Sequence, residues 1–151
     1  MNFTPSRLNI FTFFSLPSVW WCGVRITKIE ANFCEAKVMH SWINQNPFKS
    51  IFWAVQGMAA ELTTGVLIMQ AIKQHGLKVS MLVLNNRANF SKKARGKIVF
   101  NCDPKQLINK AFKGLLKGEK TQTFWLTSKG VDHNGNTVSS FEFEWTLLLK
   151  D

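Results

Sequence analysis

One apolar segment, residues 51–72, constrains the fold of this chain more than any other feature. It is long enough to span a bilayer, yet it contains Gln56, Glu61, Thr63, Thr64 and Gln70. No comparable second segment exists, so we expect a buried helix rather than a membrane span. An apolar helix of this kind needs a sheet curled around it to cover its faces.

Glu61 is the only carboxylate between Glu35 and Asp103. Ionised carboxylates are costly to bury unless they have a partner or a task. No Lys, Arg or His lies within two helical turns of Glu61, so no local ion pair accounts for it. Glu61 is therefore a candidate acid/base or nucleophilic group, although a structural, hydrogen-bonded carboxyl remains an alternative.

The remaining pattern predicts an α+β protein with one domain over residues 1–151. Residues 1–22 form a short helical arm, and strands follow at 24–31 and 33–43. The long helix begins at Lys49 or Ser50 and ends before Gly76. The later elements are strands at 77–90 and 97–102, a helix capped by Asp103 that ends at Gly118, and strands at 120–131 and 137–150. In the last strand apolar residues alternate with polar ones: Phe141, Phe143, Trp145 and Leu147 against Glu142, Glu144 and Thr146.

The net charge of +10 favours anionic partners such as phosphates, nucleic acid or a membrane surface. No nucleic-acid-binding motif is present, so we expect no nucleic acid partner. The three cysteines are Cys22, Cys34 and Cys102, and their spacing is not that of metal ligands, so we expect no metal site. Their odd number argues against a complete set of disulfides, which predicts reduced thiols and a cytoplasmic location. We expect no cofactor.

The segment from Asn44 to Ser50, followed by Met58 to Gly65, resembles hot-dog-fold thioesterases, in particular a branch described as a domain of unknown function. The resemblance implies a curled antiparallel sheet wrapped around one long central apolar helix. It also implies a homodimer or homotetramer whose sites form between subunits. Where well-known members have a His-Gly-Gly-like segment, this chain has Phe52-Trp53-Ala54.

The resemblance assigns catalysis to Glu61 and Asn46 and implies an acyl-CoA or similar thioester as substrate. For Asn46 the alternative is a loop-capping residue. Thr64, one turn after Glu61, is a candidate contact to Glu61 or to substrate, or it bonds back to its own helix. Arg87 and the basic residues after it could form one cradle for the phosphates of the substrate, or they are only the solvated end of a hairpin. These residues are Arg87, Lys92, Lys93, Arg95 and Lys97.

Two functions therefore stay open. The chain either hydrolyses an acyl thioester with the Glu61 carboxylate, or it binds acyl-CoA or fatty acyl ligands without catalysis. The isolated carboxylate favours the first function. The replacement of the His-Gly-Gly-like segment favours the second.

Overall fold

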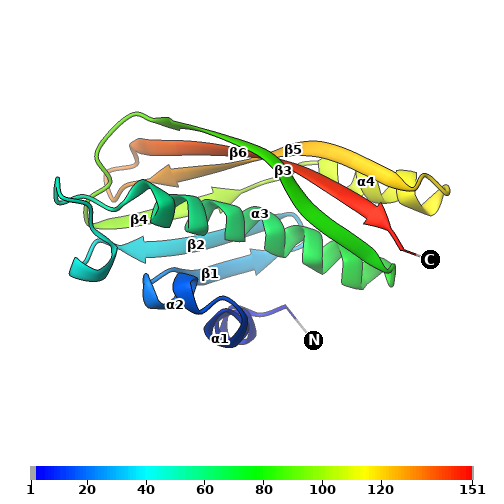
Figure 1. Cartoon of the computed structure of the whole chain (residues 1–151), viewed down its shortest axis with the longest axis horizontal. Coiled ribbons are helices and arrows are strands. Elements are labelled where there is room, and N and C mark those ends of the chain that lie inside the picture. The colour runs from blue at the N-terminus through cyan, green and yellow to red at the C-terminus, as the bar shows by residue number, and fades with distance from the viewer. Residues whose placement is uncertain (1–2, 151) are drawn as a thin grey trace.

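The apolar segment forms α3 (Trp53–His75), which lies along one face of a curled six-stranded antiparallel sheet (Figure 1). The computed structural model describes residues 3–150, so residues 1, 2 and 151 of the expected domain lie outside it. The strands are β1 (Arg25–Glu30), β2 (Phe33–Met39), β3 (Val79–Phe90), β4 (Lys97–Cys102), β5 (Thr121–Val131) and β6 (Thr137–Leu149). The other helices are α1 (Pro5–Ser15), α2 (Pro17–Trp21), the short 3₁₀ helix η1 (Trp42–Asn44) and α4 (Leu107–Leu116).

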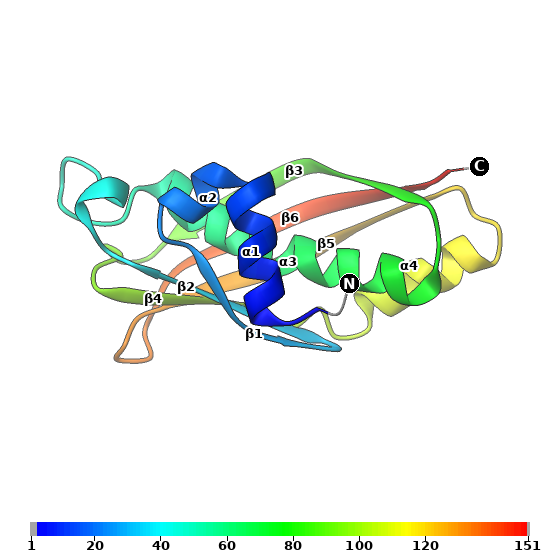
Figure 2. The same ribbon diagram turned by 90° about the horizontal axis from the view of Figure 1, so that it is seen from below.

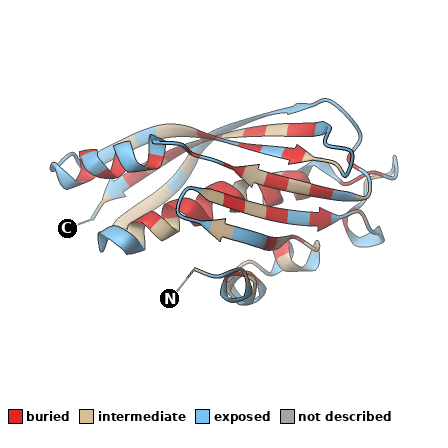
Figure 3. Ribbon diagram, turned by 180° about the vertical axis from the view of Figure 1, so that it is seen from behind, coloured by how far each residue is buried: buried red, intermediate tan, exposed pale blue. Residues whose placement is uncertain are grey.

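The strands lie in the order β1-β2-β4-β5-β6-β3, and each neighbouring pair is antiparallel. In β6 the alternation expected from the sequence is confirmed, because Phe141, Phe143 and Trp145 are buried beneath α3 while Glu142 and Glu144 alternate with them. Figure 3 shows the same alternation of buried and more exposed residues across the neighbouring strands. The sheet therefore buries one face against α3.

Three hydrogen bonds fix α3 on the buried face of the sheet. The Ser139 hydroxyl donates to Gln56 Oε1 at 2.8 Å, and the Trp145 indole N–H donates to Thr64 Oγ1 at 3.0 Å. The hydroxyls of Thr63 and Ser128 are 2.8 Å apart, and both residues are fully buried. Within residues 3–150, no helix combines the length and hydropathy needed to cross a membrane.

The start of α3 differs from the sequence prediction, whereas its end agrees. The helix begins at Trp53, after Phe52 as N-cap, and no side chain caps it. The Ile51 amide donates to the carbonyl of Ala94 at 2.8 Å. This bond holds Ile51 in an extended conformation, so the helix cannot begin before it. At the other end Gly76 adopts a left-handed conformation with φ of 63°, as the sequence predicts.

The second helix also begins later than predicted. Asp103 does not cap it, because Lys105 has a positive φ of 51° that separates Asp103 and Pro104 from α4. The Asp103 carboxylate instead accepts the Lys105 amide at 2.9 Å in a local turn. The helix therefore starts at Leu107, with Gln106 at the N-cap position.

The expected N-terminal helices are present as α1 and α2, which lie next to the edge of the sheet formed by β1 (Figure 2). Asn9 of α1 bonds to both backbone groups of Ile26, because its amide donates to the Ile26 carbonyl and accepts from the Ile26 N–H, each at 2.9 Å. This side chain substitutes for a neighbouring strand at one position. It thereby protects part of the edge from pairing with another chain.

The buried hydroxyl pair between α3 and β5 leads to a stability prediction. Replacing Thr63 with Val leaves the buried Ser128 hydroxyl without its partner, which should cost about 1–3 kcal/mol of unfolding free energy. Adding Ser128→Ala should recover part of that loss, since no unpaired hydroxyl then remains. Urea denaturation of the two single variants and the double variant measures the coupling.

The matched control is Thr123→Val, which removes a comparable hydroxyl bond to Thr146 that is exposed and 3.2 Å long. We expect this variant to change stability by less than about 0.5 kcal/mol. Additive effects of Thr63→Val and Ser128→Ala would contradict the proposed coupling.

Candidate active site

Glu61 lies in the middle of α3 on the helical face that packs next to β6. Gly57 and Gly65 are one turn before and after it on the same face. A Cβ atom at Gly57 would lie 3.4 Å from the Phe141 ring, and one at Gly65 would lie 3.4 Å from the Trp145 ring. The glycines therefore allow β6 to approach the helix closely on both sides of the carboxylate.

The Glu61 side chain is half-buried rather than fully enclosed. One carboxylate oxygen lies 3.5 Å from the position that a Gly65 Cβ would occupy. Among residues 3–150, no hydrogen bond or ion pair to the carboxylate is present, and burial raises its pKa above the ordinary range. A carboxyl group held in this way is a stronger base than an exposed one once it is ionised.

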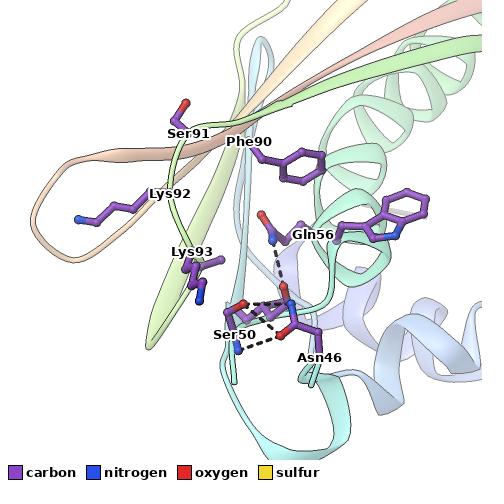
Figure 4. A pocket seen from close by; sticks show the side chains of 10 residues that line it. Asn46, Ser50, Gln56, Phe90, Ser91, Lys92 and Lys93 are labelled. Carbon is purple, nitrogen blue, oxygen red and sulfur yellow. Dashed lines mark hydrogen bonds between the residues drawn. The ribbon is translucent and has the colours of Figure 1, made fainter. Parts of the chain in front are cut away.

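A pocket of about 380 Å³ lies at the N-terminal end of α3 (Figure 4). It is formed by the loop before α3, the first turns of the helix and the turn after β3. Its lining residues are Asn46, Ser50, Ile51, Trp53, Gln56, Phe90, Ser91, Lys92, Lys93 and Ala94. Glu61 is not among them, because it lies five residues beyond Gln56, or about 7.5 Å farther along the helix.

Asn46 lies at the pocket and organises its own loop. Its Oδ1 accepts the amides of Phe48 and Ser50 at 3.0 and 3.2 Å, and its Nδ2 is 3.0 Å from the Ser50 hydroxyl. These bonds stabilise the tight turn in which Lys49 has a positive φ of 54°. The structure thus gives Asn46 a loop-shaping role and also places it beside the pocket.

Thr64 is fully buried and bonded on two sides. Its hydroxyl donates to the backbone carbonyl of Glu61 at 2.8 Å and accepts from the Trp145 indole. These bonds match the alternative in which Thr64 bonds back to its own helix. They connect it to the backbone of Glu61, not to the carboxylate.

The basic residues predicted to form one cradle are distributed over different surfaces. Arg87 pairs with Glu142 at 2.7 Å and stacks over Trp125 with 4.6 Å between the guanidinium carbon and the ring centre. Lys92 and Lys93 line the pocket, although Lys92 extends away from the other labelled side chains and bonds to Asp132 at 3.1 Å (Figure 4). Arg95 is exposed and does not line this pocket.

Sequence reasoning missed two polar residues that shape the site. Gln56 is buried at the base of the pocket, where its Nε2 donates to the Ile51 carbonyl at 3.1 Å. Asn44 is 2% exposed and bonds to the backbone of Ser41, Cys22 and Met39. A long amide side chain inside an otherwise apolar helix was a usable signal for Gln56.

No group of three His, Cys, Asp or Glu residues within the described chain is arranged to hold a metal ion. Cys34 and Cys102 are Cα partners on neighbouring strands, and both are buried. Burial raises the pKa of each thiol to about 12. Neither is therefore poised as a nucleophile.

The fold is similar to several solved structures described as thioesterases. A probable thioesterase from Pseudomonas aeruginosa is 17% identical, with a TM-score of 0.83 and 97% of each chain covered. A putative thioesterase from Shewanella oneidensis is 10% identical, with a TM-score of 0.79 and coverage of 95% of this chain and 96% of that one. A thioesterase from Haemophilus influenzae is 16% identical, with a TM-score of 0.77 and coverage of 99% and 93%.

These similarities confirm the hot-dog fold that the resemblance predicts. Because the sequence identities are low, the similarities establish the fold only. Comparison with curated protein sequences finds no match. The family described as domain of unknown function DUF4442 matches residues 6–147. Because this match extends over nearly the whole chain, the protein belongs to the DUF4442 family.

Proposed function

We propose that this protein hydrolyses acyl thioesters, such as acyl-CoA, with the Glu61 carboxylate. The observation that carries the proposal is a half-buried carboxylate without a bonded partner among the described residues, on the central helix of a hot-dog fold. Keeping such a group costs stability, which is expected where it serves a reaction. The similarity to structures described as thioesterases supports the same reaction class.

In the proposed reaction, the Glu61 carboxylate takes a proton from a water molecule that attacks the thioester carbonyl, and the C–S bond breaks to release a carboxylic acid and a thiol. In the other route Glu61 itself attacks the carbonyl, the thiolate leaves, and water hydrolyses the resulting anhydride. The carbonyl oxygen would be polarised by backbone N–H groups at the N-terminus of α3, where no side chain caps the helix. Trp53 and Ala54 supply the first amides of that turn. An uncapped helix end next to a pocket is suited to bind a developing oxyanion.

The two parts of this site lie too far apart to act on one carbonyl within a single chain. Glu61 is eight residues after Trp53, which corresponds to about 12 Å along the helix axis. A homodimer with antiparallel α3 helices would place Glu61 of one chain beside the helix N-terminus of the other. We therefore propose a homodimer, or a tetramer built from such dimers, in keeping with the exposed Leu82 and Leu84 on edge strand β3.

We assign the pocket at the start of α3 to the substrate. Asn46 would hold the loop that forms one wall, and Lys93 would contact phosphates of a CoA-like carrier. Lys92 is the second candidate, although its bond to Asp132 must open first. The apolar walls supplied by Ile51, Trp53 and Phe90 suit an acyl chain.

The alternative is a protein that binds acyl-CoA or fatty acyl ligands without hydrolysing them. It is favoured by Trp53, whose bulky side chain lines the pocket where the resemblance leads us to expect a glycine. A large ring there narrows the approach to the helix N-terminus. Under this alternative Glu61 is a structural carboxyl and the pocket retains its ligand.

Glu61→Gln tests the catalytic role. If Glu61 is the base or nucleophile, this variant should lose about 100-fold or more in thiol release from acyl-CoA, because acid–base groups contribute at least that much. Steady-state assays over a series of acyl chain lengths measure the effect. Glu30→Gln is the matched control, since Glu30 is exposed and paired with Lys28.

Two results would decide against catalysis by Glu61. Equal turnover by wild type and Glu61→Gln would remove the carboxylate from the reaction. Absence of turnover on every thioester, together with saturable acyl-CoA binding by both proteins in calorimetry, would establish the binding alternative.

The raised pKa of Glu61 also predicts a pH-dependent stability difference. Below the ordinary carboxyl pKa of about 4.3 the group is protonated in both folded and unfolded chains, so burial carries no charge penalty. As pH rises through the raised folded pKa, the ionised carboxylate becomes costly and the folded state loses stability. Glu61→Gln should therefore be more stable than wild type near pH 8 and about equal near pH 4.

Urea denaturation at a series of pH values measures this difference, with Glu30→Gln as the exposed control. A stability gap that does not change with pH would mean that Glu61 titrates like an exposed carboxyl. A gap that narrows as pH rises would show that the folded state lowers its pKa.

A further inference from the structure

Large apolar side chains on α1, α2 and η1 project into solvent. Trp42 is 84% exposed in η1, Trp21 is 66% exposed at the end of α2, and Phe14 is 76% exposed in α1. Ile43, next to Trp42, is 49% exposed. We call these four residues the aromatic tip.

The three elements that carry the aromatic tip contact one another. The Phe13 ring contacts both Phe14 and Trp20, with ring centres 4.9 and 5.3 Å apart. The Asn44 side chain donates to the Cys22 carbonyl at 3.0 Å, which ties η1 to the end of α2. Figures 1 and 2 both show α2 beside η1.

Exposed cations border the aromatic tip. Lys49 lies in the loop that follows η1, and Lys93 and Arg95 lie in the turn between β3 and β4; all three are exposed. Hydrogen bonds hold that turn against the loop, since the Ile51 amide donates to the Ala94 carbonyl and the His40 amide donates to the Gly96 carbonyl. We call Lys49, Lys93 and Arg95 the basic rim.

Carboxylates are absent from the segments that carry the aromatic tip and the basic rim. Residues 3–29, 40–52 and 91–97 contain no Asp or Glu. Asp132, in the turn between β5 and β6, is near enough to bond to Lys92, and that bond neutralises it. The tip therefore combines projecting aromatic rings with uncompensated positive charge.

We propose that the aromatic tip and the basic rim dock this protein onto the surface of an anionic phospholipid bilayer. Tryptophan favours the boundary between lipid chains and water, where its ring is apolar and its N–H stays hydrated. The basic rim supplies attraction to lipid phosphates. A nucleic acid would also attract the cations, but it offers no place for Ile43 and Phe14.

This docking is peripheral and independent of thioester turnover. The exposed rings belong to α1, α2 and η1, which lie outside the sheet, whereas α3 lies against its inner face. Only the tip side chains would enter the headgroup region. The proposed location also places a pocket suited to acyl chains, with Lys93 on its wall, near the lipid surface.

Co-sedimentation of the full chain with vesicles tests the proposal. Wild type should bind vesicles of phosphatidylcholine mixed with phosphatidylglycerol and bind pure phosphatidylcholine far less. The double variant Trp21→Ser/Trp42→Ser should weaken binding roughly tenfold or more, because apolar surface no longer enters the lipid. Each charge removed in Lys49→Gln and Arg95→Gln should weaken binding about fivefold.

Matched controls come from α4, which lies far from α2 and η1 in the molecule (Figure 1). Leu116→Ser replaces an apolar residue that is 55% exposed at the end of α4, and Lys110→Gln and Lys113→Gln remove exposed cations from the same helix. These variants should bind vesicles like wild type. Circular dichroism and thermal melting establish that every variant is folded.

Three results would overturn the proposal. Wild type that fails to bind the anionic vesicles excludes lipid docking. Equal loss of binding in the α4 variants shows that binding follows total charge rather than this surface. In the third, light scattering shows that Trp21→Ser/Trp42→Ser converts a wild-type oligomer to monomers, while vesicle binding is unchanged. That result would assign the aromatic tip to contacts between copies of the chain.

Discussion

The arrangement of this protein depends on how α3 is held against the sheet. The helix is apolar on most of its faces, so hydrophobic burial alone would not select one rotation of the helix about its axis. Gln56 and Thr64 accept hydrogen bonds from β6, and the Thr63 hydroxyl is bonded to Ser128 of β5. Because these side chains leave the helix at different angles and heights, the bonds fix both its rotation and its position along the sheet.

That rotation decides the environment of Glu61. It directs the face carrying Gly57, Glu61 and Gly65 toward β6, where the Phe141 and Trp145 rings fill the space that larger side chains would occupy. The carboxylate therefore lies at the margin of the packed region, desolvated but still partly exposed. A different rotation would direct it at the fully buried residues of β2 and β4, where an unpaired charge would cost much more.

The elements were predictable from sequence where local pattern and tertiary packing agree. The alternation in β6 and the glycine that ends α3 depend on nearby residues, and both are confirmed. The starts of α3 and α4 were predicted wrongly for different reasons. A hydrogen bond to Ala94, distant in sequence, keeps Ile51 extended, and a left-handed Lys105 interrupts a capping pattern that looked favourable.

The site was less predictable, because side-chain direction on a strand depends on the register with its neighbours. Arg87 is close in sequence to Lys92 and Lys93, yet it pairs with Glu142 on β6 and stacks on Trp125 of β5. That pairing satisfies the one arginine on β3 with a carboxylate on the adjacent strand. The basic residues at the pocket are therefore lysines. Their long flexible side chains suit a phosphate bound near the surface, whereas a fixed bidentate contact would require an arginine.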